Sequence, residues 1–338
     1  MIAHRTRFVW LLSCALASAQ TWVIQLSGTD ASLRGVSAVN GRVVWASGTG
    51  GTWLKTTDGG TTWKSGKVPD AEQLDFRDLH TADARTVYLM SIGAGEQSRI
   101  YKTNDGGIHW RLLFTNPDAR GFLDALAFWD ARRGLVIGDA VDGHPAVFLT
   151  VDGGEHWQRQ STPAAIPNEG SFAASGTCLT VRGNSEAWFG TGGEGAGRVF
   201  HSVDGGHTWT VSPTPIRKDR PSAGIFSLAF AGGRHGIAVG GDYTQPDDAA
   251  GNIAVTADGG NTWTVPAGGP HGFRSAVAYV ADEKMWISTG TSGSDISYDG
   301  VIWKTFDTGS FNALSFVSGK TGWAVGPKGR IARFQPAR

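Results

Sequence analysis

The stretch Thr56-Thr57-Asp58-Gly59-Gly60-Thr61-Thr62-Trp63 carries the motif that decides the fold: Ser or Thr, one residue, Asp-Gly-Gly, two residues and Trp. The short Asp side chain can accept hydrogen bonds from amides of its own turn, and glycine readily adopts the positive φ of tight β-turns. The Trp opens the next strand and can bury a large ring. The motif therefore predicts a tight β-hairpin that presents a tryptophan to the core.

The same motif recurs along the chain. It returns around Asp105, Asp152, Asp204 and Asp258, and a shortened copy contains Asp299. Consecutive aspartates lie 47, 47, 52, 54 and 41 residues apart. This period is typical of one four-stranded β-propeller blade. Because six near-identical sites cannot form one active centre, we expect all six motif aspartates to be structural.

A second repeat sets the number of blades. Short apolar strands that end in small residues occur seven times, at residues 43–48, 86–93, 134–138, 186–190, 236–240, 284–290 and 321–326. A third set precedes them as inner strands, at residues 33–36, 76–79, 122–125, 172–175, 225–228, 273–276 and 311–314. The sequence therefore predicts an all-β, seven-bladed propeller of four-stranded antiparallel blades, formed by residues 20–338 as one domain.

The seventh blade has no copy of the motif after its third strand, Ile331–Phe334. A candidate fourth strand lies at the other end of the chain, at Thr21–Gln25, where Trp22 takes the place of the motif tryptophan. We therefore expect the N-terminal strand to close the ring by pairing with the C-terminal blade, since closure leaves few strand edges exposed.

Composition narrows the classes of function. Lys plus Arg and Asp plus Glu number 30 each, so no basic excess indicates a nucleic-acid partner. Apolar residues make up 40% of the chain, enough for a sizeable core. Histidines lack metal-ligand spacing, and the glycine-rich stretch 190–197 precedes no helix that could hold phosphate. We expect no cofactor and no metal, and a monomer.

The first 19 residues resemble an export signal. Arg5 and Arg7 precede an apolar segment of about ten residues, 8–17, which is too short to span a bilayer. Ala17-Ser18-Ala19 is a small-x-small cleavage site, which predicts a periplasmic or secreted chain starting at Gln20. A lipoprotein acylated at Cys14 is the alternative. Cleavage after Ala19 leaves Cys178 alone, so no internal disulfide can form.

The motifs resemble the Asp-box (BNR) repeats of bacterial sialidases. The order of strands, boxes and strand-ending glycines over nearly the whole mature chain is more similar to photosystem II stability/assembly factor-like propellers. This resemblance implies a seven-bladed propeller and a scaffold that binds a partner protein. It is specific for the fold and weak for the function, because Asp boxes occur in enzymes, receptors and scaffolds alike.

Strand order places a candidate binding site on the rim opposite the Asp boxes, at the mouth of the central channel. Arginines there could clamp a carboxylate. The predicted binding residues, all in loops or strand ends of this rim, are Arg34, Arg77, Arg274, Asp139, Asp142, His144, Glu169, Asp242 and Tyr243. We expect a protein, peptide or glycan ligand. Solvated ion pairs that stiffen the loops are the alternative reading of these charges.

A sialidase-like glycoside hydrolase is the alternative function. Such an enzyme would need a carboxylate pair and a Tyr nucleophile, and the candidates are Glu169, Asp139, Asp242 and Tyr243. The Phe-Arg-Ile-Pro-type strand of sialidases is absent, and most sialidases have six blades. The sequence therefore favours a binding module over a hydrolase.

Overall fold

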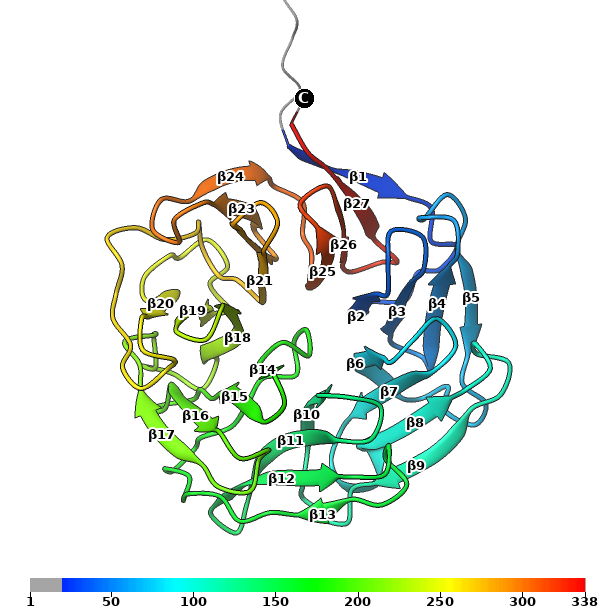
Figure 1. Ribbon diagram of the computed structural model, residues 1–338, viewed down its shortest axis with the longest axis horizontal. Coiled ribbons are helices and arrows are strands. Elements are labelled where there is room, and N and C mark those ends of the chain that lie inside the picture. Colours follow the sequence, from blue (N-terminus) through cyan, green and yellow to red (C-terminus); the bar gives the residue numbers. More distant parts are fainter. Residues whose placement is uncertain (1–19, 338) are drawn as a thin grey trace, which may run out of the picture.

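Seven antiparallel β-sheets surround a central axis in the computed structural model, which describes residues 20–337 (Figure 1). The predicted all-β, seven-bladed propeller is confirmed. The only helix in the described range is a short 3-10 turn, η1 (Gly95–Gln97), and no helix there is long and apolar enough to cross a bilayer. The predicted export signal, residues 1–19, lies outside the described residues.

The first four blades follow one another along the chain, each from the axis outward. They contain β2 (Leu33–Ala38), β3 (Val44–Gly48), β4 (Thr52–Thr56) and β5 (Lys64–Lys67); β6 (Asp75–Thr81), β7 (Val87–Ile92), β8 (Arg99–Thr103) and β9 (Arg111–Thr115); β10 (Leu123–Phe128), β11 (Gly134–Val141), β12 (His144–Thr150) and β13 (Gln158–Arg159); and β14 (Leu179–Arg182), β15 (Glu186–Gly190), β16 (Arg198–Ser202) and β17 (Thr210–Pro213).

The last three blades complete the ring. They contain β18 (Ala223–Ala231), β19 (His235–Asp242) and β20 (Ile253–Thr256); β21 (Ala276–Val280), β22 (Met285–Gly290), β23 (Gly293–Ser297) and β24 (Lys304–Asp307); and β25 (Ala313–Ser318), β26 (Thr321–Val325), β27 (Ile331–Gln335) and the N-terminal β1 (Thr21–Gln25). Strand β1 pairs with β27 over its full length, with Trp22 opposite Phe334, so the predicted ring closure is confirmed (Figure 1).

Two blades depart from the expected strand pattern. The predicted inner strand at residues 172–175 is wrong: β14 begins at Leu179, because Gly176 has φ +75° and turns the chain away from the extended conformation. The fifth blade has three strands, and only a single bridge, Val255 to Thr264, stands where its outer strand was expected. Pro266 lies two residues after Thr264 and has no N–H to continue a ladder.

The five complete motif turns share one hydrogen-bond pattern, seen in the first of them, and the shortened turn at Asp299 has the same kinds of bond one residue closer along the chain. The Thr56 hydroxyl accepts a bond from the Gly60 amide at 2.9 Å, and the Asp58 carboxylate accepts one from the Thr62 amide at 2.9 Å. Bonds from the Thr62 amide and hydroxyl lower the pKa of Asp58 to about 2. Each aspartate is thus occupied within its own turn.

Neighbouring blades share apolar clusters and polar links near the axis. Tyr88 in the second blade stacks on Phe128 in the third, with ring centroids 4.4 Å apart. The buried Asp78 in β6 accepts bonds from the Leu79 amide and, across the blade boundary, from the Leu126 amide, both at 2.7 Å. This link holds two inner strands in fixed register around the axis.

Asp78 makes stability depend on pH. Burial raises its pKa to about 7 despite the two amide bonds. A carboxyl whose folded pKa is above its unfolded value stabilises the fold fully at pH below about 4, and this contribution is lost as the pH rises to about 7. Over this window Asp78 should lower the free energy of unfolding of the wild type by roughly 2–4 kcal/mol. We expect Asp78→Asn to lack this pH-dependent decrease.

Urea denaturation of the wild type and Asp78→Asn at intervals from pH 4 to pH 8 measures this effect. The difference between the two unfolding free energies should change with pH even if the variant is less stable throughout. The matched control is Asp83→Asn, which alters an exposed hairpin carboxylate of the same blade. A pH-independent difference for Asp78→Asn would show that its carboxyl does not titrate in this range.

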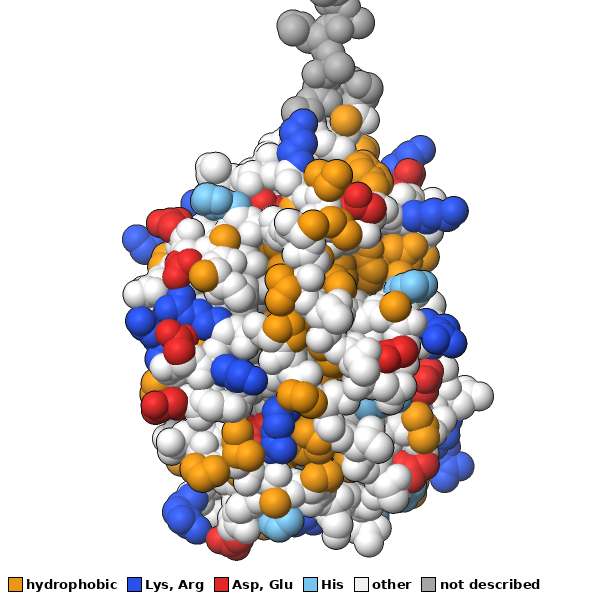
Figure 2. All heavy atoms as spheres, turned by 90° about the vertical axis from the view of Figure 1, so that its left-hand side faces the viewer, with side chains coloured by type: hydrophobic (Ala, Val, Ile, Leu, Met, Phe, Trp, Pro, Cys, Tyr) orange, Lys and Arg blue, Asp and Glu red, His pale blue; other side chains and the backbone are white. Residues whose placement is uncertain are grey.

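The outer surface carries mixed charge. Figure 2 shows the side formed by the blades of β17, β20 and β24, where basic and acidic side chains are interspersed with apolar and neutral ones. This agrees with the balance of 30 basic and 30 acidic residues over the whole chain. The exterior on this side therefore offers no patch of a single charge sign.

Candidate functional site

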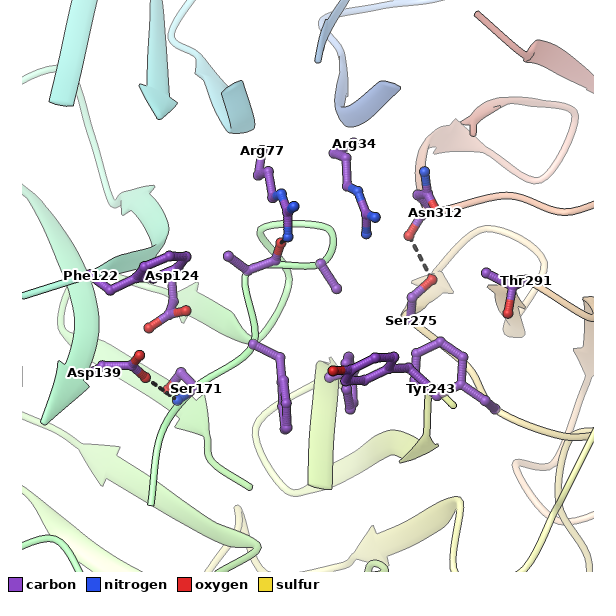
Figure 3. A pocket seen from close by; sticks show the side chains of 15 residues that line it. Arg34, Arg77, Phe122, Asp124, Asp139, Ser171, Tyr243, Ser275, Thr291 and Asn312 are labelled. Atoms are coloured by element: carbon purple, nitrogen blue, oxygen red, sulfur yellow. Dashed lines mark hydrogen bonds between the residues drawn. The ribbon is translucent and has the colours of Figure 1, made fainter. Parts of the chain in front are cut away.

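A cavity of about 490 Å³ lies at one mouth of the central channel (Figure 3). Residues at the start of the inner strands line it, whereas the motif turns lie at the opposite end of the blades. The strand register shows this in the first blade. Leu33, at the cavity end, pairs with Gly48, which pairs with Thr52. The motif residue Thr56 pairs with Val44 at the other end of the blade. The cavity therefore lies on the rim predicted from strand order.

A β-bulge at one repeated position aims side chains into the cavity. The register of the inner strand shifts by one residue in blades one, two, three and five, and the residues passed over are Arg34, Arg77, Asp124 and Phe226. All four line the cavity. A bulge leaves one residue without a partner and re-aims its side chain, so the same local irregularity presents a different chemical group from each blade.

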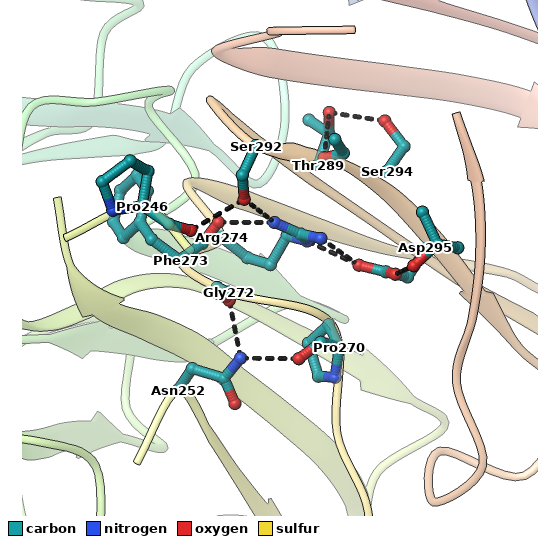
Figure 4. A network of polar contacts seen from close by, with 12 residues as sticks. Pro246, Asn252, Pro270, Gly272, Phe273, Arg274, Thr289, Ser292, Ser294 and Asp295 are labelled. Carbon is teal, nitrogen blue, oxygen red and sulfur yellow. Dashed lines mark hydrogen bonds and ion pairs between the residues drawn. The ribbon is translucent and has the colours of Figure 1, made fainter. Parts of the chain in front are cut away.

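The arginines Arg34, Arg77 and Arg274 were predicted at equivalent positions, at the start of inner strands, and the structure corrects this for Arg274. The amides of Leu33, Arg274 and Phe311 each bond to the strand-ending glycine of the preceding blade, so these three residues are equivalent. Arg274 thus precedes the cavity position, which Ser275 occupies in its blade. The Arg274 side chain is fully buried, with Nε 2.6 Å from Asp295 Oδ2, and it does not line the cavity (Figure 4).

One side of the cavity is cationic. Arg77 Nε lies 2.8 Å from Asp75 Oδ2, and its Nη1 donates to the Ala173 carbonyl at 3.3 Å. Arg34, which is half-buried, forms no ion pair or side-chain hydrogen bond with any of residues 20–337. Burial and then the charge of Arg77 lower the pKa of Arg34. An anion placed between the two guanidinium groups would relieve this repulsion and supply the missing partner.

A second side is acidic and belongs to the third blade. Asp124 is buried, and its Oδ2 has no hydrogen-bond partner within the described chain. Asp139 follows the strand-ending Gly138 at another register shift, and its Oδ1 accepts a bond from the Ser171 amide at 3.1 Å. Burial raises the pKa of both carboxyls, and the charge of Asp139 adds to the rise at Asp124.

A third side is aromatic. Phe172 stacks on Phe226 with ring centroids 3.9 Å apart, and Phe273 meets Phe226 edge to face at 4.7 Å. Tyr243 is half-exposed and stands 6.2 Å from Phe226, with its ring toward the cavity in Figure 3. These rings offer flat apolar surface to a ligand whose charged group lies at the arginines.

Two of the predicted carboxylates are committed elsewhere. The buried Glu169 pairs with Arg198, whose Nε lies 2.9 Å from Glu169 Oε1, and it also accepts a bond from the Thr191 hydroxyl at 2.6 Å. Asp242 accepts bonds from the Thr244 amide and hydroxyl at 2.9 and 2.7 Å. Neither lines the cavity, so only Asp139 and Tyr243 of the four candidate hydrolase residues reach it.

Asp142 and His144 lie on the β11–β12 hairpin, away from the cavity. Asp142 has φ +53° in the turn and an exposed carboxylate 3.2 Å from Arg120. His144 Nδ1 lies 2.7 Å from the Thr162 carbonyl. A separate shallow hollow contains both residues together with Arg159. Of the nine predicted binding residues, four line the central cavity: Arg34, Arg77, Asp139 and Tyr243.

Sequence reasoning missed Asp124 and the phenylalanine cluster. Asp124 follows Leu123 as Arg34 follows Leu33, so aligning the blades on the apolar residue before the bulge would have found it. The aromatic side has no such signal, because Phe172 lies in a loop and Phe226 reads as one more core residue of an apolar strand.

No protein-family model and no curated protein matches the sequence. Among solved structures, "YCF48 bound to D1 peptide" is similar, with a TM-score of 0.65 and 17% identity over 93% of this chain and 96% of that one. YCF48 from Cyanidioschyzon merolae gives 0.67 and 16% over 94% and 99%, and U3-55K gives 0.65 and 12% over 94% and 98%. At these identities the likeness establishes the propeller fold alone.

Proposed function

We propose that this protein is an exported, non-enzymatic scaffold that binds a peptide segment of a partner protein in the central cavity. The observation that carries the proposal is the pair Arg34 and Arg77, which brings two guanidinium groups to one wall while Arg34 has no anionic partner in residues 20–337. Guanidinium groups recognise carboxylates through charge-assisted hydrogen bonds. The ligand is expected to place a carboxylate there and an apolar side chain against Phe226 and Tyr243.

Two further points support a peptide-binding scaffold over a hydrolase. A protein of the same fold, YCF48, has been solved bound to a D1 peptide, so a propeller of this kind can hold a peptide. The engagement of Glu169 with Arg198 leaves the predicted carboxylate pair of a hydrolase incomplete at the cavity. The export proposal depends on residues 1–19 alone, and N-terminal sequencing of the mature protein tests it.

Binding can be tested with an array of random hexapeptides presented with free C-terminal carboxylates, and with the same array amidated. We expect retained protein on the free-carboxylate array and on peptides rich in Asp or Glu. A fluorogenic sialoside and other fluorogenic glycosides, incubated with the same preparation, test the hydrolase. Turnover that is abolished by Asp139→Asn with folding intact would replace the scaffold proposal with a glycosidase.

Arg34→Ala and Arg77→Ala are each expected to weaken the tightest array peptide at least tenfold, because a hydrogen bond to a charged group contributes about 1.5–3 kcal/mol. Isothermal titration calorimetry measures the change, and higher salt should weaken wild-type binding. The control Arg42→Ala removes an exposed arginine from the opposite rim and should leave the affinity unchanged. If the wild type and all three variants bound the peptide with equal affinity, the peptide would lie outside the cavity.

A further inference from the structure

The acidic side of the cavity is built from two bulges in one blade. Asp124 occupies the register shift between β10 and β11, and Asp139 occupies the shift between β11 and β12. Each shift frees one residue from the ladder, and both freed residues line the same cavity (Figure 3). A blade with one bulge would present a single carboxyl group, so the second irregularity brings two carboxyl groups to one wall.

These carboxylates have no cationic partner within residues 20–337. Arg77 is the arginine whose charge acts on Asp124, but its Nε is bonded to Asp75 at 2.8 Å and it forms no ion pair with Asp124. Asp124 is only 1% exposed, and its buried Oδ2 atom has no hydrogen-bond partner in the part of the chain that the structure describes. A buried polar atom left without a partner destabilises the fold, and a hydrogen-bond donor of a ligand in the cavity would offset this cost.

We propose that Asp124 and Asp139 form a cation subsite that holds an ammonium or guanidinium group of the ligand. This inference rests on the proposed function and narrows it: the peptide carries a basic side chain close to its carboxylate. Arg34 and Arg77 line the adjoining side of the cavity, and Tyr243 lies on a third side (Figure 3). A bound peptide would therefore place its positive group at the third blade and its carboxylate at the arginines. An ammonium group between two carboxylates also lowers their mutual repulsion.

Three matched probes test the subsite by calorimetry with the full mature chain. The first is acetyl-Lys-Gly-Phe with a free carboxylate, the second has Nε-acetyl-lysine in place of lysine, and the third is the C-terminal amide of the first. We expect the wild type to bind the first about tenfold more tightly than the second, a difference of about 1.4 kcal/mol. The first and second probes both retain the carboxylate and the ring.

The variants Asp139→Asn and Asp124→Asn/Asp139→Asn should lose this tenfold preference and bind the first and second probes about equally. Asp142→Asn, which alters an exposed carboxylate of the same blade outside the cavity, should retain the preference. Asp139→Asn serves if the double variant fails to fold, and the wild-type comparison needs no variant.

Each outcome separates the two proposals. Equal wild-type affinity for the first and second probes, with weak binding of the amide, overturns the cation subsite and leaves the carboxylate site intact. If both Asp variants still prefer the first probe over the second, the subsite is also overturned, because another group must then bind the ammonium. No binding of any probe counts against the proposed function and removes the basis of the subsite.

Discussion

Trp22→Ala is expected to lower the free energy of unfolding by about 3–5 kcal/mol, the cost typical of removing a large buried aromatic side chain. The indole is 5% exposed and meets four phenylalanines, with its centroid 5.5 Å from Phe334 and 5.7 Å from Phe311. Its Nε1 also donates to the Ser294 hydroxyl at 3.0 Å in the preceding blade. One side chain therefore joins the first strand to the last two blades.

The effect should exceed that of other truncations in β1, because the rest of this strand is held mainly by backbone pairing with β27. Guanidinium denaturation followed by tryptophan fluorescence and circular dichroism measures it. Val23→Ala is the matched control: Val23 is the adjacent residue, 45% exposed, and its truncation should cost less than about 0.5 kcal/mol. Similar losses of unfolding free energy for Trp22→Ala and Val23→Ala would mean that the Trp22 side chain does not stabilise the ring closure.

The fold could be predicted because its information is local and repeated. Each motif turn holds its own aspartate through bonds within a few residues, as Asp58 does with the Thr62 amide. Ring closure could be predicted because Trp22 lies in a strand like those that follow the motif, although no motif precedes it. Only the C-terminal blade lacked a fourth strand, so this strand was expected to pair there. Both inferences needed composition and spacing, and neither needed the exact register of any strand.

The site depends on register, and register could not be read from spacing. A bulge at Arg34 and Arg77 aims both into the cavity, whereas Arg274 stands one position earlier and points into the core, although all three open similar segments. A shift of one residue moves a strand side chain to the other face, so an alignment error of one residue changes the role assigned.

Pairing was the second obstacle. The sequence predicts Glu169 as a binding residue of the rim, but Arg198, 29 residues later on β16, pairs with both of its carboxylate oxygens. Local sequence around Glu169 carries no sign of that partner. The four predicted residues that do line the cavity, among them Asp139 and Tyr243, were placed by strand order alone.

Arg274 gives the second large expected effect. Arg274→Met should destabilise the protein by about 3–5 kcal/mol, because it leaves Asp295 buried with only the Thr305 hydroxyl, 2.6 Å away, as a strong partner. Asp295→Leu should cost a similar amount, since it leaves a buried guanidinium with its remaining bonds to the Phe273 carbonyl and the Ser292 hydroxyl (Figure 4). Removing either partner leaves one uncompensated charge.

Arg274→Met combined with Asp295→Leu should recover most of this loss, because replacing a whole buried ion pair by apolar groups of similar size is often close to neutral. Urea denaturation of the four proteins in a double-mutant cycle measures the coupling. The combined variant should also bind the array peptide with wild-type affinity, since Arg274 lies outside the cavity, in contrast to Arg34→Ala. A weakened affinity in the folded combined variant would return Arg274 to the binding site, whereas additive losses would show that the pair contributes no coupling.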